Sequence, residues 1–181
     1  HDEKEKEIWN KKSKEKILTA YMSEHFIDVE NPSVINEYSC GKINESGRLK
    51  VYDFFDDMRH YLVSENKVIE SRFDYAMLDP ENKIYQNIHY ENIVFAEGTQ
   101  VHHNPYFGEV PVQPNKGHHL ILKTEEVINQ EYTIKKKHFL FPLKDTTYYY
   151  GSTYDRESDN SEIDQQAVEE LKNGLKQFYN G

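Results

Sequence analysis

The chain has 181 residues, which is enough for one domain or two small ones with a core of their own. Charged residues make up 30%, but aromatic residues reach 13%, which argues against disorder because disordered chains lack rings to bury. The formal net charge of -10 repels phosphate backbones, and the basic clusters at residues 11–16 and 135–137 are predicted to be solvated faces. No apolar run approaches the roughly 18 residues of a membrane helix. Composition therefore predicts a soluble protein with neither a nucleic-acid nor a membrane partner.

Cysteine content and the N-terminal segment bear on location. Cys40 is the only cysteine, which excludes a disulfide framework and a cysteine-based zinc site. Residues 1–16 are charged where a signal peptide would need an apolar stretch. We therefore expect a cytoplasmic protein.

The first third of the chain predicts two helices. Apolar side chains at helical spacing indicate a helix over residues 5–26, which a turn at Asn31-Pro32-Ser33 ends. Residues 34–42 are predicted to form a short strand, and a turn at residues 44–47 leads into the second helix. That helix carries the clearest apolar stripe of the chain, formed by Val51, Phe54, Phe55, Met58, Tyr61 and Leu62.

After Asn66 the apolar period changes from that of a helix to that of a strand. Residues 68–78 and 83–89 are predicted to be strands, which the turn Asp79-Pro80-Glu81-Asn82 joins into an antiparallel hairpin. Residues 92–98 are a short, nearly continuous apolar run ending in small residues, which suits a buried parallel strand.

In the last third of the chain apolar and polar residues alternate again, which indicates three strands, at residues 119–123, 137–142 and 147–151. A closing helix is expected from Ser161, with Asp164 completing an N-terminal cap pair. Its apolar stripe comprises Ile163, Ala167, Leu171, Leu175 and Phe178. The elements together predict an α+β fold with a mixed, mostly antiparallel sheet flanked by helices.

Two adjacent histidine pairs, His102-His103 and His118-His119, raise the hypothesis of a metal-dependent hydrolase. Neighbouring residues on a strand point to opposite faces, so each pair offers at most one ligand to a given site. Residues 155–166 lack the glycine and glutamate that a calcium loop needs. We therefore predict no metal site. Gly-x-Ser-x-Gly is absent, so no nucleophile motif is present, and without Gly-x-Gly-x-x-Gly the sequence has no recognisable cradle for a nucleotide phosphate.

Several short motifs follow one another in the second half of the chain. Residues 93–98 match a strand of the form I-V-x-A-x-G, and residues 104–107 with Pro111 match the loop that follows it. Residues 114–118 approximate a turn of the form P-x-K/R-G-E/Q, with His118 in the last place. Residues 139–143 and 150–154 match paired strands ending in P and in G-G/A/S-T. In this order the motifs resemble FAD-dependent oxidoreductases of the D-amino-acid oxidase and glycine oxidase family.

The family's N-terminal dinucleotide fingerprint is missing, and so is its C-terminal region, which often supplies an arginine for the substrate carboxylate. The resemblance therefore implies an internal fragment, inactive alone, that holds the substrate-binding domain and a piece of the flavin domain. It divides the chain into three parts. These are residues 1–90 (N-terminal helices and hairpin of the substrate-binding region), 91–115 (flavin-domain-like strand and loop) and 116–181 (substrate-binding sheet and closing helix).

The resemblance also implies a cofactor, a substrate and the residues near them. FAD would belong to the full-length parent, near Ala96, Glu97, Gly98 and Thr99, where small residues allow close backbone contact. A small amine or amino acid would meet a wall of rings, of which alternate residues face the same side: Phe139, Phe141, Tyr148 and Tyr150. Packing within the sheet is the alternative role for these rings, and a tight strand end is the alternative for residues 96–99. No catalytic residue is assigned, because the family relies mainly on flavin and substrate geometry.

A non-enzymatic binding or interaction domain is the alternative function. It is favoured by the missing phosphate cradle, by the acidity of the chain and by the tyrosine-rich segment at residues 148–151, which could pair at an exposed strand edge.

Overall fold

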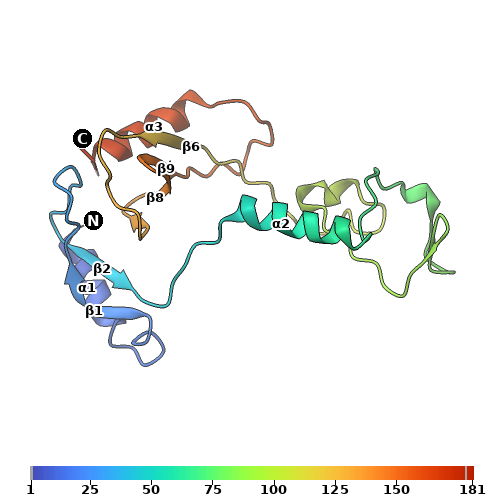
Figure 1. Ribbon diagram of the computed structural model, residues 1–181, viewed down its shortest axis with the longest axis horizontal. Coiled ribbons are helices and arrows are strands. Elements are labelled where there is room, and N and C mark those ends of the chain that lie inside the picture. Colours follow the sequence, from blue (N-terminus) through green and yellow to red (C-terminus); the bar gives the residue numbers. More distant parts are fainter. Residues whose placement is uncertain (1, 178) are drawn as a thin grey trace. The chain divides into compact units, whose positions relative to one another are not determined.

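A computed structural model describes residues 2–177 and 179–181 (Figure 1). The chain divides into two compact units, of which the first joins His1–Gly47 to Asn115–Gly181 and the second is Arg48–Pro114. This division differs from the predicted one, because residues of the N-terminal segment share a core with the C-terminal segment. Helices accompany antiparallel strand pairs in both units, which confirms the α+β class.

The first unit begins with a helix and a two-stranded antiparallel hairpin: α1 (Glu3–Lys12), β1 (Met22–Ile27) and β2 (Cys40–Ile43). The helix predicted over residues 5–26 therefore ends early, and its second half is wrong. Trp9 lies against Gly41 of β2, where an added Cβ would collide with the indole, and its Nε1 donates to Ser23 O of β1 at 2.9 Å. Contacts distant in sequence thus override the helical spacing of the apolar side chains.

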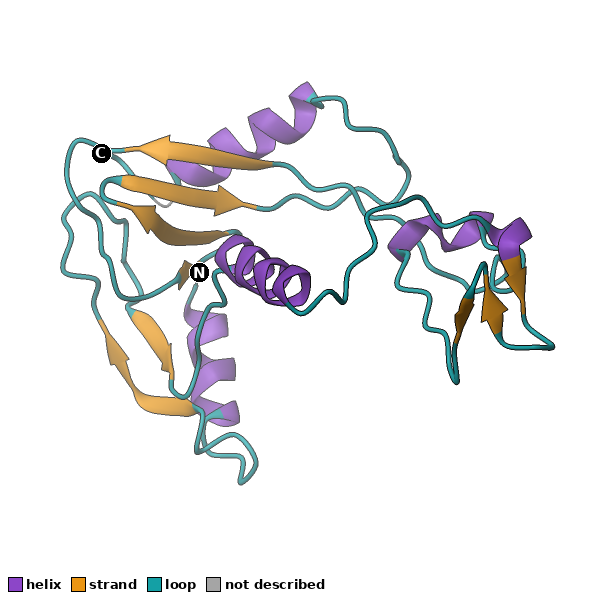
Figure 2. Ribbon diagram, turned by 45° about the vertical axis from the view of Figure 1, so that its right-hand side comes forward, coloured by secondary structure: helices purple, strands orange, loops and turns teal. Residues whose placement is uncertain are grey.

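A four-stranded antiparallel sheet follows, with the strand order β6-β9-β8-β7 (Figure 2). Its strands are β6 (His119–Lys123), β7 (Ile134–Lys135), β8 (Phe139–Lys144) and β9 (Thr147–Gly151). The three strands predicted in this region are confirmed as β6, β8 and β9. The two-residue strand β7 was not predicted, because two residues are too few to show a period.

Helix α3 (Gln165–Lys176) packs on one face of this sheet (Figure 2). Its N-cap is Asp164, whose carboxylate accepts a hydrogen bond from Gln166 N–H at 2.8 Å. The predicted start at Ser161 is therefore too early, and Ile163 precedes the helix with 72% of its surface exposed. Phe178 of the predicted stripe lies outside the described residues. The core of the unit comprises Val29, Val34, Ile128, Ile134, Leu140, Tyr148, Tyr150 and Leu171.

The second unit holds one long helix and short elements: α2 (Val51–Ser64), η1 (Tyr75–Met77), β3 (Leu78–Asp79), β4 (Ile84–Tyr85), β5 (Ile88–His89) and η2 (Gly98–His103). Helix α2 confirms the predicted helix. The predicted antiparallel hairpin is present only as the short β3–β4 pair. The strand predicted over residues 68–78 is wrong before Leu78, because η1 precedes β3, and the strand predicted over residues 83–89 is divided into β4 and β5. The buried strand predicted at residues 92–98 is wrong: Val94 is 86% exposed, and the run leads into η2. An apolar run becomes a strand only where a neighbour pairs with its backbone.

Within the described residues, no helix combines the length and the apolar character that crossing a membrane requires.

Candidate functional site

The two faces of the four-stranded sheet carry different side chains. On the face covered by α3, Leu140, Tyr148 and Tyr150 are at most 2% exposed. The Tyr148 hydroxyl accepts a hydrogen bond from Ile128 N–H at 2.8 Å and donates one to Asn129 O at 3.1 Å. Burial raises the pKa of Tyr150 to about 12. Both tyrosines are therefore part of the core.

The opposite side of the sheet, here called the aromatic face, presents His119, Ile121, Phe139, Phe141 and Tyr149. The Tyr149 ring stacks on Phe141, with centroids 4.5 Å apart and planes 8° apart, and on His119 at 4.7 Å and 23°. Ile121 is 56% exposed and Phe139 is 39% exposed. Three strands thus contribute one continuous row of flat rings, which suits a small ligand with a planar or apolar part.

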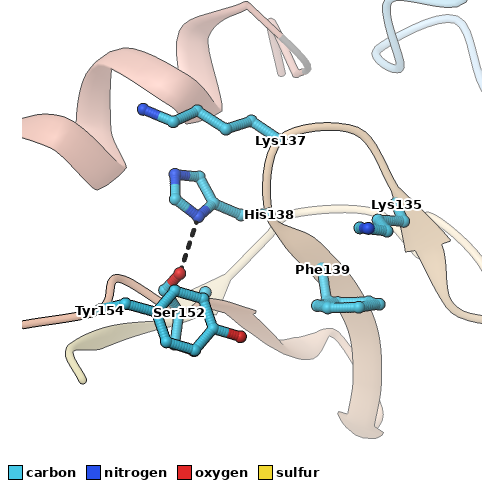
Figure 3. Close-up of a pocket in the computed structure, with 7 residues that line it drawn as sticks. Lys135, Lys137, His138, Phe139, Ser152 and Tyr154 are labelled. Atoms are coloured by element: carbon cyan, nitrogen blue, oxygen red, sulfur yellow. Dashed lines mark hydrogen bonds between the residues drawn. The ribbon is translucent and has the colours of Figure 1, made fainter. Parts of the chain in front are cut away.

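A hollow of about 110 Å³ opens beside Gly151, at one end of this row (Figure 3). In the sheet Gly151 lies between His119 and Phe139. An added Cβ at Gly151 would lie 2.7 Å from the Cβ of His119, so the glycine allows the two strands to approach there. The lining of this Gly151 hollow consists of Lys135, Lys137, His138, Phe139, Gly151, Ser152 and Tyr154.

His138 connects the wall of the hollow to α3. The side chain is 4% exposed, and its Nδ1 donates a hydrogen bond to Ser152 O at 3.0 Å (Figure 3). Its Nε2 makes no hydrogen bond within the described part of the chain and lies 3.8 Å from Glu170 Oε1. The same carboxylate oxygen pairs with Lys137 Nζ at 2.7 Å. Glu170 therefore ties the basic side of the hollow to the helix.

The four rings predicted to form a substrate wall do not lie together. Phe139 and Phe141 are on the aromatic face, whereas Tyr148 and Tyr150 are buried on the other face. Tyr149, which lies between the two tyrosines in sequence, takes their place beside Phe141. The predicted wall is therefore wrong on β9, where Tyr149 and not Tyr148 or Tyr150 lies beside Phe141.

A β-bulge causes this difference. The register between β8 and β9 shifts between Pro142 and Lys144, so that Phe141 pairs with Tyr149. Without the extra residue Phe141 would pair with Tyr150, and all four predicted rings would share one face. Pro142 was the available signal, because a proline inside a strand often marks a bulge.

The residues predicted to approach a flavin lie in the second unit, around the start of η2: Ala96, Glu97, Gly98 and Thr99. All but Glu97 are exposed, and Gly98 adopts a φ of +58°. Glu97 has a structural role instead, because its carboxylate accepts hydrogen bonds from the Tyr75 hydroxyl and from Asn104 Nδ2, the latter at 2.7 Å. The bond to Glu97 raises the pKa of Tyr75.

Residues 96–99 were tested as a contact site for FAD, the cofactor that the family resemblance implies. Their exposed backbone leaves room for a ring system to approach. However, the sequence lacks the glycine-rich turn between a strand and a helix that cradles a dinucleotide diphosphate. These residues by themselves therefore do not fit the whole of FAD.

The two histidine pairs belong to different units, and members of each bond within their own unit. His102 Nε2 lies 2.7 Å from Val112 O in the second unit, and His118 Nε2 accepts a hydrogen bond from Asp164 N–H at 3.0 Å in the first. Among residues 2–177 and 179–181, no three His, Cys, Asp or Glu side chains are grouped as a metal ion would require. This arrangement gives the hypothesis of a metal-dependent hydrolase no support.

Comparison with known proteins does not assign the chain to a family. No family model matches it, and no solved structure matches it. Function is therefore inferred from the aromatic face and the Gly151 hollow, together with the motifs of the sequence.

Proposed function

We propose that this chain is the substrate-binding part of a longer FAD-dependent oxidoreductase, which oxidises a C–N bond of an amino acid or a related amine. The proposal starts from the motifs of residues 93–154, which resemble the D-amino-acid oxidase and glycine oxidase family. The observation that supports it best is the aromatic face, because a partly exposed row of rings on a sheet with a packed rear face suits a substrate wall. The sheet and α3 would then be the family's substrate-binding sheet and closing helix.

In such an enzyme the flavin, when bound, supplies the acceptor for the hydride that leaves the carbon bearing the amine. The side chains of this chain would orient the substrate and exclude water from it. Phe141 and Tyr149 would form the flat wall, and the Gly151 hollow would receive the substrate's polar end. FAD would be held mainly by other parts of the longer protein, with residues 96–99 approaching it.

The visible absorption spectrum of the longer protein, recorded beside that of this chain, tests the proposal. We expect a flavin spectrum in the longer protein and none in the 181-residue chain, which lacks the phosphate cradle. A longer protein that stays colourless after addition of FAD would overturn the proposal and favour the alternative below.

A substitution in the longer protein tests the wall itself. Phe141→Ala removes the ring that stacks on Tyr149, so we expect kcat/KM to fall roughly ten- to a hundredfold through misplaced substrate. Ile163→Ala is the matched control, because Ile163 is a 72% exposed apolar residue of the same unit. An unchanged kcat/KM in Phe141→Ala would contradict the role of the wall while leaving the flavin spectrum unaffected.

A non-enzymatic interaction domain is the second candidate. The exposure of Ile121 and Phe139 on the aromatic face favours it, because contiguous apolar surface also marks protein interfaces. The two candidates differ in the spectrum, since an interaction domain needs no flavin.

A further inference from the structure

We infer that the Gly151 hollow binds a small oxyanion, meaning a carboxylate or a phosphate group. The inference goes beyond the proposed function, because it is carried by the charges that surround the hollow and requires no flavin. It would hold equally for an interaction domain that binds a small acid.

The lysines at the hollow have different partners. Lys137 pairs with Glu170 at 2.7 Å, on the side of α3. Lys135 Nζ lies 5.2 Å from the centroid of the Phe139 ring, and no carboxylate of the described residues lies within ion-pair distance of it. Lys135 thus keeps an uncompensated positive charge beside the ring that lines the hollow.

His138 also lines the hollow, with only 4% of its surface exposed. Both of its nitrogens face acceptors, since Nδ1 donates to Ser152 O and Nε2 faces Glu170 Oε1. Nε2 is buried without a hydrogen-bond partner, which is unusual for a polar atom in a folded protein. The hollow therefore has a buried polar side chain in its wall as well as two lysines in its lining.

The net charge around the hollow is therefore opposite in sign to the net charge of the whole chain. The formal net charge of the chain is -10, yet Lys135 and Lys137 line the hollow against the one carboxylate of Glu170. Such a local excess of positive charge on an acidic protein attracts small anions selectively. Ser152 and Tyr154 complete the lining.

Size limits the ligand. The volume of about 110 Å³ is well below the roughly 300–1,000 Å³ of pockets for drug-sized molecules. A nucleotide does not fit, whereas a carboxylate with a short apolar chain does. That apolar chain would lie against the Phe139 ring, next to the cation that holds the acid group. If the proposed function holds, the ligand is the acid group of the substrate.

Titration of the complete 181-residue chain with propionate, and separately with inorganic phosphate, tests the inference. Ionic strength is kept constant with sodium chloride, and the amide NMR shifts of Gly151 and Ser152 are followed. We expect saturable shifts centred on these two residues. Saturation by propionate alone identifies a carboxylate site, saturation by phosphate alone identifies a phosphate site, and saturation by neither overturns the inference.

Charge variants show whether the binding is specific. Lys135→Gln is expected to weaken the affinity roughly tenfold, because it removes one charged hydrogen-bond donor. Lys144→Gln is the matched control: it removes the same charge from an exposed lysine at the far end of β8 and should leave the affinity within about twofold. Equal weakening by both variants would mean general attraction and would overturn the inference. Lys135→Arg, which keeps the charge, should retain saturable binding.

The outcome is independent of the flavin test. Saturable anion binding with a colourless longer protein would support the anion site and refute the oxidoreductase. A flavin spectrum without saturable binding at Gly151 would support the oxidoreductase and refute the anion site.

Discussion

In the first unit the largest buried side chains lie between a sheet and a helix, whereas in the second unit aromatic rings pack on one another. Leu140, Tyr148 and Leu171 of the first unit are fully buried. Among residues 48–114, all of which the structure describes, only Asn104 is buried, and its Nδ2 donates to Glu97.

The rings of the second unit contact each other in a compact group. Phe73 stacks on Tyr85 with centroids 4.2 Å apart, and Phe95 meets Phe73 edge-on at 5.6 Å. Stacked pairs contribute about 0.5–1.5 kcal/mol beyond the area they bury. A unit held by such contacts and by hydrogen bonds to one carboxylate has a lower free energy of local unfolding than a unit with a packed core. We therefore expect local unfolding to begin in the second unit.

The largest effect is expected from the core of the first unit. Leu171→Ala removes a fully buried side chain but keeps a good helix former in α3, so the loss comes from packing alone. We expect the free energy of unfolding to fall by about 2–5 kcal/mol, measured by urea denaturation. Ile163→Ala, at a 72% exposed site just before α3, should change it by less than about 0.5 kcal/mol. Equal losses of unfolding free energy in Leu171→Ala and Ile163→Ala would contradict the assignment of Leu171 to the core and of Ile163 to the surface.

Alkaline pH provides a second test of the same core. The pKa of Tyr150 is raised to about 12, so the folded protein holds this proton more tightly than the unfolded chain, where the usual pKa is about 10. The resulting contribution to the free energy of unfolding is fully present below about pH 10 and is lost as the pH rises toward about 12. Two pKa units correspond to about 3 kcal/mol of unfolding free energy.

Tyr150→Phe isolates this contribution, because it removes the titrating hydroxyl and keeps the ring. Its free energy of unfolding should fall less steeply between about pH 10 and pH 12 than that of the unmodified chain. Tyr52→Phe is the control, since Tyr52 is 87% exposed and should leave the slope unchanged. Identical slopes for the unmodified chain and Tyr150→Phe would contradict the prediction.

In the second unit the corresponding test is Glu97→Ala. It leaves Asn104 Nδ2, on a side chain that is 2% exposed, without its acceptor, at a cost of about 1–3 kcal/mol. Amide hydrogen exchange should become faster over residues 73–107 while β8 and β9 stay protected. Because the hydrogen bond is lost, the pKa of Tyr75 should also fall toward its usual value.

Two variants show whether this effect belongs to the carboxylate. Glu97→Gln keeps one acceptor oxygen and should restore most of the protection. Glu91→Ala removes an exposed carboxylate of the same unit and should leave exchange unchanged. Faster exchange in both units of Glu97→Ala would show that the units do not unfold separately.

The sequence predicted those elements whose period is visible over several residues. Strands β6, β8 and β9 and helices α2 and α3 each show a period within the element itself. The helix predicted over residues 5–26 was wrong in its second half. Trp9 contacts Gly41, which lies 32 residues further along the chain, and a periodicity within residues 5–26 cannot reveal such a contact. Residues 92–98 look like a strand in sequence but pair with no strand among the residues that the structure describes.

The candidate site was predicted only in part, because the register between β8 and β9 decides which alternate residues of the two strands share a face. The alternation of β8 and the alternation of β9 were each correct, so Phe139 and Phe141 were placed on a common face. Which residues of β9 join them depends on the number of residues in the connection, and the bulge between Pro142 and Lys144 changes that number by one. The Gly151 hollow depends on the same register, because Gly151 reaches Phe139 only across the paired strands.

The smallest effect is expected on the aromatic face, where Ile121→Thr should change the free energy of unfolding by less than about 0.5 kcal/mol. Ile121 is 56% exposed, and threonine keeps the β-branched shape that suits a strand. The matched variant Ile134→Thr places a hydroxyl at a 6% exposed site of β7 and should cost about 1–3 kcal/mol. If the two variants cost the same in urea denaturation, the aromatic face is covered in solution and belongs to a core. If Ile121→Thr is neutral, these rings stabilise the unit little, and their exposure is best explained by a ligand or partner that binds them.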